Sequence, residues 1–393
     1  MTTARREPTP SRSARRLAVA VVLGSLALAA SASAAVKEFP VSDEPSAIAA
    51  GPDGNLWFTE PLTKNHRVST SHRIGKITTS GKVTYYSAGI SGTPGDIAAG
   101  RDGNLWFTDP LSQINNAQDV AKITPSGAVT EFPMAAADGS GIFVHSLTAG
   151  PDGNMWFTGI QKQCTRTGTP SEPPPPPPLP PPSGSPPPPP APSGPMAVTA
   201  IVTEYCGQFR RVGKITPAGV VTDYTGPEVF PGNITTGPHG NLWFIQESPA
   251  EQVGIGKITP AGVVTEYSLG GRAINITAGP DGNLWFTQNE ANRIGKITTT
   301  GAITYYSVGK SHYELAAIAV GPDGNLWFSG AYMRHRIGRI TTSGKVTYYT
   351  AGISGTPGAI ATGRDGNLWF TETEPNRIAR FSIAGHKRGR KHH

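Results

Sequence analysis

The chain has 393 residues and a formal net charge of +7, and 8% of its residues are aromatic. Length alone would suggest two or three domains, and the charge would suggest a nucleic-acid partner. The positions of the charges exclude that partner, because five arginines lie in the first 34 residues and four basic residues lie in the last nine. The segment between these ends is close to neutral, so we expect no nucleic-acid surface.

Residues 1–34 are typical of an export signal. A basic stretch ends at Arg16, an apolar run of 14 residues covers 17–30, and small residues at 31–35 provide a cleavage site. The apolar run is too short to span a bilayer comfortably. We therefore expect a protein without a transmembrane segment that is located outside the cell or in its envelope. The paired Arg15 and Arg16 leave the Sec and the twin-arginine export routes open.

One motif is repeated along the chain. Gly279-Pro-Asp-Gly-Asn-Leu-Trp-Phe-Thr287 has six further copies, and these begin at Gly51, Gly100, Gly150, Gly237, Gly321 and Gly363. All seven tryptophans fall inside the copies, and the last four tryptophans are 42 residues apart. A period of about 40–45 residues built from short strands is typical of β-propellers, one blade per repeat. The sequence predicts an all-β, seven-bladed propeller.

Residues 274–306 show the pattern of one blade. Short runs at 274–279, 283–287, 293–298 and 302–306 are rich in β-branched and aromatic residues and are separated by turn residues. They predict a four-stranded antiparallel blade. Because every blade keeps its tryptophan, we expect these rings to pack between neighbouring blades and to form no site.

The last blade lacks a fourth strand before the chain reaches residue 385. Val36–Phe39 follows the same pattern as the fourth strand Val264–Tyr267, so the N-terminal strand is predicted to complete that blade and close the ring. The propeller then covers 35–385. We interpret residues 386–393 as a solvated basic tail, with weak attraction to an anionic wall or membrane as the alternative.

A Pro-rich insertion at about 165–205 interrupts the third blade between its second and third strands. Residues 173–195 consist almost entirely of Pro, Ser and Gly, which favours exposed polyproline II segments over a packed domain. The only cysteines, Cys164 and Cys206, flank the insertion. A symmetric hairpin would bring them face to face, which predicts a disulfide in an exported protein, with two free thiols as the alternative.

Candidate site residues lie on the face where second strands end and first strands begin. Two residues after each Trp-Phe pair, the seven blades carry Glu60, Asp109, Gly159, Gln246, Gln288, Gly330 and Glu372. Blade one adds Glu44 at the start of its first strand. Glu44 and Glu60 could share a hard cation such as Mg²⁺ or Ca²⁺, with support from Glu372 and Asp109, or they could be solvated carboxylates. Without such an ion we expect no cofactor.

The seven copies of Gly-Pro-Asp-Gly-Asn-Leu-Trp-Phe-Thr and Arg-Ile-Gly-Lys-Ile-Thr resemble the virginiamycin B lyase (streptogramin lyase) family over residues 36–385, apart from the insertion. The resemblance implies a seven-bladed propeller that opens a cyclic depsipeptide by Mg-dependent elimination. It also implies a site with Glu-Pro-His, a second Glu sixteen residues later and a further His from the preceding blade. Glu44 and Glu60 match the two metal-ligand positions.

The histidine positions of that family do not match. The base position is Ser46, and the position in the preceding blade is Gly358. A serine needs an activating partner to act as a base near neutral pH. The histidines left as candidates are His145, which occupies the equivalent position in blade three, and His312 in a loop of the same face.

These residues leave several functions open. We expect a secreted monomeric propeller that binds a small molecule, peptide or polysaccharide on its loop face, or that acts there as a divergent metal-assisted enzyme. An active lyase opening a cyclic depsipeptide lactone is one alternative. A non-catalytic propeller that binds cell-wall polymers, sugars or protein is the other.

Overall fold

The structure is a computed structural model that describes residues 35–61, 72–109, 118–134, 141–167, 203–225, 230–247, 253–289, 291–309 and 314–383. The predicted export signal, most of the Pro-rich insertion, the basic tail and His312 lie outside these ranges. Within them, no helix is both long enough and apolar enough to cross a membrane.

The described strands form seven four-stranded antiparallel sheets, which confirms the predicted fold class. Blade one consists of β2 (Ile48–Ala50), β3 (Leu56–Thr59), β4 (Ile74–Ile77) and β5 (Val83–Tyr86). Blade two consists of β6 (Ile97–Ala99), β7 (Leu105–Asp109), β8 (Gln118–Ile123) and β9 (Val129–Met134). Blade three consists of β10 (Ile142–Ala149), β11 (Met155–Thr167), β12 (Thr203–Ile215) and β13 (Val221–Thr225). Blade four consists of β14 (Phe230–Thr236), β15 (Leu242–Glu247), β16 (Gly254–Ile258) and β17 (Val264–Ser268). Blade five consists of β18 (Ala273–Ala278), β19 (Leu284–Gln288), β20 (Arg293–Ile297) and β21 (Ile303–Ser307). Blade six consists of β22 (Leu315–Val320), β23 (Leu326–Gly330), β24 (Ile337–Ile340) and β25 (Val346–Tyr349). Blade seven consists of β26 (Thr356–Thr362), β27 (Leu368–Thr373), β28 (Arg377–Ser382) and β1 (Ala35–Pro40).

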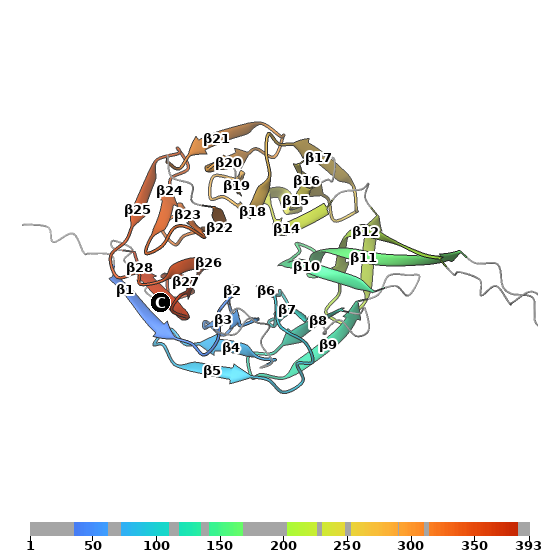
Figure 1. Cartoon of the computed structure of the whole chain (residues 1–393), viewed down its shortest axis with the longest axis horizontal. Helices are drawn as coiled ribbons and strands as arrows, with labels where there is room; N and C mark the ends of the chain where they lie inside the picture. Colours follow the sequence, from blue (N-terminus) through green and yellow to red (C-terminus); the bar gives the residue numbers. More distant parts are fainter. Residues whose placement is uncertain are drawn as a thin grey trace, which may run out of the picture. The chain divides into compact units, whose positions relative to one another are not determined.

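The seven blades form a closed ring (Figure 1), because each first strand contacts the first strand of the next blade and β26 contacts β2. The N-terminal strand β1 pairs with β28 and completes the last blade, as the sequence predicts. Phe39 of β1 stacks on Trp369 with the ring centroids 5.8 Å apart. In blade four, Tyr267 of the fourth strand stacks on Trp243 in the same way at 5.6 Å.

Each tryptophan belongs to a local unit that recurs around the ring. In blade five the Trp285 indole Nε1 donates to the Asp281 carboxylate at 3.0 Å, and the Tyr306 ring stacks on the indole at 5.4 Å. A Cβ atom on Gly279 would lie 2.4 Å from the Trp285 ring. Only glycine leaves the indole this space, which explains why the motif begins with glycine.

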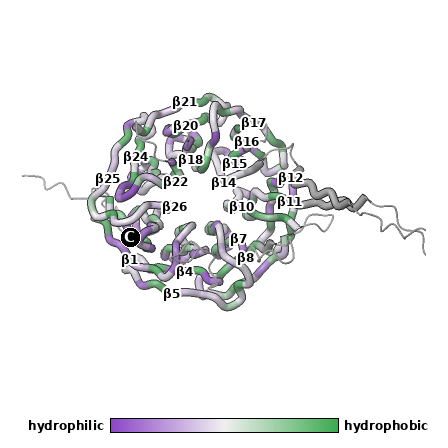
Figure 2. Tube along the Cα trace, in the orientation of Figure 1, coloured by the Kyte–Doolittle hydropathy of each residue, from purple (hydrophilic) through white to green (hydrophobic). Residues whose placement is uncertain are grey.

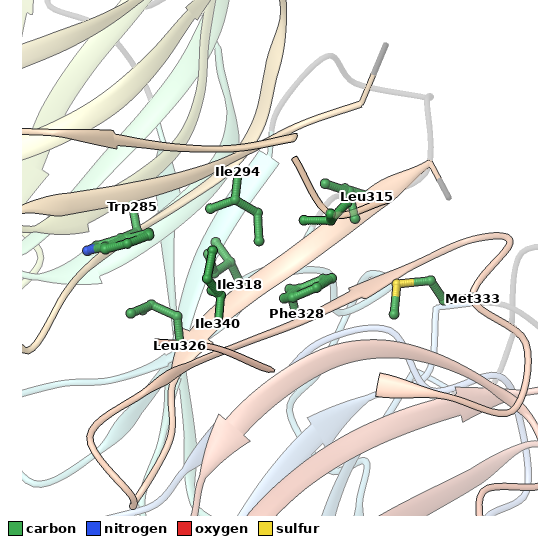
Figure 3. Packing of buried hydrophobic residues seen from close by; sticks show 9 residues of the cluster. Trp285, Ile294, Leu315, Ile318, Leu326, Phe328, Met333 and Ile340 are labelled. Atoms are coloured by element: carbon green, nitrogen blue, oxygen red, sulfur yellow. The ribbon is translucent and has the colours of Figure 1, made fainter. Parts of the chain in front are cut away.

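The tryptophans also join the blades. Trp285 of blade five lies in one hydrophobic cluster with Leu326 and Ile340 of blade six (Figure 3). All seven indoles are fully buried, which fits the predicted packing role. Figure 2 shows hydrophobic and hydrophilic residues interleaved all around the ring. The buried hydrophobic clusters include residues from all seven blades.

The strands β11 and β12 are longer than the others and extend away from the ring (Figure 1). Their register places Phe157 opposite Gly213 and Cys164 opposite Cys206, as predicted from a symmetric hairpin. The cysteine side chains lie outside the described part of the structure, so the disulfide stays a prediction.

Candidate functional site

A hydroxyl group near the end of the second strand, present in every blade except blade four, which has Ile245, ties the predicted site face together. In blade one, Thr59 Oγ1 accepts from the Ala47 amide at 3.1 Å and donates to the carbonyl of Gly95 in blade two at 2.8 Å. Equivalent bonds run from Thr287 to Ala316 and from Ser329 to Gly358. These carbonyls belong to the residues in the family's histidine position, so the backbone at that position is held by the neighbouring blade.

Glu60 is buried and fully bonded inside the protein. Its Oε2 accepts from Arg73 Nη2 at 2.9 Å, and its Oε1 accepts from the Tyr85 hydroxyl and the Asp43 amide at 3.2 Å each. Burial raises the pKa of the Glu60 carboxyl, while the bonded Arg73 guanidinium opposes that rise. Arg73 also donates to Asp43 at 3.1 Å and stacks on the Tyr85 ring. Glu60 is therefore one end of an internal ion pair.

Glu44 and Ser46 lie beside this ion pair on the segment before β2. Glu44 is half-buried and Ser46 is exposed. Among the described residues, no group of three or more His, Cys, Asp or Glu side chains is arranged to hold a metal ion. A divalent cation at the Glu60 oxygens would face the Arg73 guanidinium, so these residues as arranged do not fit a Mg²⁺ ion. The cation site at Glu44 and Glu60 stays a prediction.

The two supporting carboxylates belong to their own blades. Asp109 accepts from the Gly92 amide at 3.1 Å, and Glu372 accepts from the Gly355 amide at 3.3 Å. The pKa of Asp109 is raised to about 6, mainly by burial and then by the neighbouring Glu131 carboxyl. Burial and then the charge of Glu38 raise the pKa of Glu372 to about 7. Each carboxyl thus forms a pair with an acid of its own blade.

The candidate bases are placed differently. His145 is exposed on β10, at the register irregularity between Val144 and Ser146. Gly358 has no room for a side chain as the structure stands, because a Cβ atom there would lie 2.6 Å from Thr371 Oγ1. His312 lies outside the described residues.

Sequence reasoning missed Arg73, Tyr85 and His72. His72 Nδ1 lies within hydrogen-bonding range of the Gly92 carbonyl, which ties blade one to blade two on this face. Arg73 was detectable, because it begins the repeated run Arg-Ile-Gly-Lys-Ile, and the register Thr59 opposite Ile74 places it across from Glu60. Tyr85 follows from the same ladder, opposite Gly75.

A pocket of about 360 Å³ lies between blades six and seven on this face. Its lining comes from the first strands and from the connections after the second strands, and consists of Ala316, Ala331, Arg334, Thr356, Pro357, Gly358, Thr373 and Glu374. Arg334 and Glu374 form an exposed ion pair at 3.3 Å. The pocket includes Gly358, the position where the family resemblance expects a second histidine.

The fold and the repeated tryptophan unit define a seven-bladed β-propeller of the four-stranded type. The sequence profile of the Virginiamycin B lyase family matches residues 24–169 and 199–386. The chain belongs to the virginiamycin B lyase family.

Solved structures agree with this assignment. A streptogramin B lyase structure is 25% identical, with a TM-score of 0.64 over 89% of this chain and 97% of that chain. Virginiamycin B lyase from Staphylococcus aureus is 24% identical, with a TM-score of 0.64 over 89% of this chain and 99% of that chain. A catalytically inactive histidine-to-alanine variant of the S. aureus enzyme with quinupristin gives the same values. A comparison with curated protein sequences gives no match.

Proposed function

We propose that this propeller binds a small polar molecule in the pocket between blades six and seven and does not open streptogramin rings. The observation that carries the proposal is the replacement of both expected histidines, by Ser46 and Gly358. The bond between Glu60 and Arg73 supports it, because that carboxylate is already neutralised by a guanidinium.

The chemistry of the elimination supports the same conclusion. Removing a proton next to an ester carbonyl requires a base, and a positioned base contributes about 10²–10⁴-fold to such a step. The S. aureus enzyme is catalytically inactive when one histidine becomes alanine. A serine hydroxyl such as that of Ser46 is not a base near neutral pH without an activating partner.

The pocket favours a polar ligand. Its volume of about 360 Å³ is at the small end of ligand pockets, and its lining includes the hydroxyls of Thr356 and Thr373. Arg334 and Glu374 at the rim offer a cation and an anion, and an exposed ion pair of this kind contributes little to stability. A charged or hydroxylated ligand can replace it at small cost. A sugar or a short peptide fits this chemistry, and the export signal would place the encounter outside the cytoplasm.

Lyase activity is the second candidate, and membership of the family is the observation that favours it. In that case another base would replace the missing histidines. The candidates named from the sequence are His145, which is exposed on β10, and His312.

Two measurements on the full chain test the proposal. Mass spectrometry should show no ring opening of quinupristin in the presence of Mg²⁺. Ligand-observed NMR with monosaccharides, amino acids and dipeptides should find binding that disappears in Ala331→Trp, which fills the pocket. Ala351→Trp, at an exposed alanine that is not among the residues lining the pocket, is the matched control and should keep binding.

Ring opening would support the second candidate and contradict the first. Binding that survives Ala331→Trp would place the ligand elsewhere on the propeller.

A further inference from the structure

Each blade carries three equivalent positions at its loop end, here called the rim trio. The first position is three residues after the tryptophan. The second position is two residues before the Gly or Ala in the middle of the third strand. The third position lies on the fourth strand, directly opposite that Gly or Ala. In blade one the rim trio is Glu60, Arg73 and Tyr85, and the guanidinium bonds the carboxylate and stacks on the ring.

Blade five repeats this arrangement with a neutral first member. Its rim trio is Gln288, Arg293 and Tyr305, in which Arg293 bonds the amide oxygen and stacks on the ring at 3.7 Å. In these two blades the arginine therefore satisfies the buried polar group of the second strand.

The seven rim trios can be compared as internal controls. The rim trio of blade two is Asp109, Asp119 and Glu131. The rim trios of the other blades are Gly159, Arg211 and Asp223 in blade three; Gln246, Gly254 and Glu266 in blade four; Gly330, Arg336 and Tyr348 in blade six; and Glu372, Arg377 and Glu38 in blade seven. Blade two alone has three acidic residues and no basic or amide residue, which gives its rim trio a formal charge of −3. Asp119 stands directly opposite Asp109 in the ladder between β7 and β8, the place that Arg377 takes opposite Glu372.

The rim trio of blade two offers the Asp109 carboxyl no guanidinium or amide partner. Its side chain is fully buried, and Oδ2 accepts from the Gly92 amide at 3.1 Å. Its Oδ1 is buried and has no hydrogen-bond partner among the residues that the structure describes. Glu131 Oε1 accepts from the Ser91 amide at 2.8 Å, and the Glu131 carboxyl contacts that of Asp109. A buried acceptor left without a partner is destabilising, which indicates a missing positive or donating group.

Two other blades show how such a carboxylate is satisfied. In blade four, Gln246 Nε2 donates to the Glu266 carboxylate at 3.0 Å. In blade seven, Arg377 bonds the Glu38 carboxylate. Blade two has neither an amide nor an arginine at the corresponding positions.

We propose that the rim of blade two binds a divalent cation between the carboxylates of Asp109 and Glu131. The ligands are carboxylate oxygens only, which favours a hard cation, and the irregular buried setting favours Ca²⁺ over the strictly octahedral Mg²⁺. The site is separate from Glu44 and Glu60 of blade one and does not depend on the ligand pocket of blades six and seven.

Calorimetry on the full chain after removal of metals tests the site with Ca²⁺ and Mg²⁺ in separate titrations. The wild type should bind Ca²⁺ with a stoichiometry of one and more tightly than Mg²⁺. Asp109→Asn should weaken Ca²⁺ binding by at least about ten-fold, because it removes a charged ligand. This variant should still fold, since its amide can donate to Glu131 as Gln246 does to Glu266. Asp119→Arg supplies the arginine that five other blades carry at this position and should also displace the cation.

Glu60→Gln and Glu372→Gln are the matched controls and should leave Ca²⁺ binding unchanged. Loss of binding in Glu60→Gln but not in Asp109→Asn would overturn the proposal and assign the cation to blade one. Absence of Ca²⁺ binding in the wild type would also overturn it, and higher stability of Asp109→Asn would then indicate that the two carboxyls share a proton.

Discussion

At the scale of single residues, the repeat makes exceptions visible. In six blades an aspartate accepts the indole N–H of the blade's tryptophan. Blade four has His239 at this place, and Trp243 Nε1 is buried without a partner among the described residues. His239 also has a positive φ of 59°, so the turn of this blade differs from the others. One substitution therefore leaves a buried donor unsatisfied.

Restoring the aspartate should stabilise the protein. His239→Asp provides an acceptor for the Trp243 indole and an anion near Lys257, which lies 5.6 Å from the Trp243 ring. We expect the free energy of unfolding to rise by about 1 kcal/mol, seen as a melting temperature higher by about 2 °C. Asp281→His in blade five is the reverse control and should lower the melting temperature. A lower melting temperature for His239→Asp would show that the turn cannot adopt the common form.

The buried Glu372 predicts a pH-dependent stability. Its pKa is 4.5 in the reference state and about 7 in the folded protein, so the folded state favours the protonated carboxyl. Below pH 4.5 both states hold the proton and there is no penalty. Between pH 4.5 and about 7 the unfolded chain releases this proton while the folded protein keeps it, so the wild type loses about 3 kcal/mol of stability over that window relative to a neutral side chain. Above pH 7 both states are ionised, and the loss stays constant.

Glu372→Gln should therefore stabilise the protein at pH 8 and change little at pH 4, as measured by denaturant unfolding at each pH. Gln246 shows that a glutamine fits this position beside a fourth-strand carboxylate. Gln246→Glu should give the opposite pH dependence. Equal effects of Glu372→Gln at both pH values would contradict the assigned ionisation.

At the scale of elements, the long hairpin of blade three predicts a disulfide. Directly opposed residues of antiparallel strands have Cα atoms about 4.5–5.5 Å apart, within the range that a disulfide spans. Cys164 and Cys206 are such a pair. The pairing of β11 with β10 ends at Gln161 and that of β12 with β13 begins at Arg211, so the cysteines lie beyond the four-stranded part of the blade.

Protein isolated without reductant should consequently contain no alkylatable thiol by mass spectrometry. Reduction should increase proteolysis of the hairpin and lower the melting temperature only slightly, because the cross-link lies outside the blade core. The chain-entropy estimate of about 4 kcal/mol for a loop of this length is then an upper limit. Two alkylatable thiols in native, non-reduced protein would refute the disulfide.

The elements were predictable because their signals are local. A turn with Asp-Gly followed by Asn-Leu-Trp-Phe specifies a hairpin without reference to the rest of the chain. The strand limits expected in blade five differ from the observed ones by one residue at most positions. The partners of Glu60 were missed, because Arg73 precedes β4 and Tyr85 lies on β5, and their contact with Glu60 follows only when the strand register is combined with side-chain direction. The pocket depends on small residues of two blades, which no single repeat reveals.

At the scale of the whole molecule, ring closure depends on the first strand. The strand β1 pairs with β28 along six residues, and Glu38 accepts from the Ser354 amide at 2.7 Å and bonds Arg377. Phe39 is 8% exposed and stacks on Trp369, so it takes the role that a fourth-strand aromatic has in other blades. The chain therefore closes by joining residues from its two ends, and this closure determines whether β28 is an open edge.

Removing the Phe39 ring should loosen this closure. Phe39→Ala deletes a buried aromatic side chain, and we expect a loss of about 3–5 kcal/mol in the free energy of unfolding. Phe39→Tyr should retain most of the stability, since Tyr267 serves the same position in blade four. Lys37→Ala, at an exposed position of the same strand, removes only a side chain whose ammonium lies 5.1 Å from the Phe39 ring centroid, so this control leaves the core intact and should cost far less. Because an open β28 edge favours pairing between chains, Phe39→Ala should also form oligomers on size-exclusion chromatography with light scattering. A variant that melts like the wild type and stays monomeric would show that the ring holds without this contact.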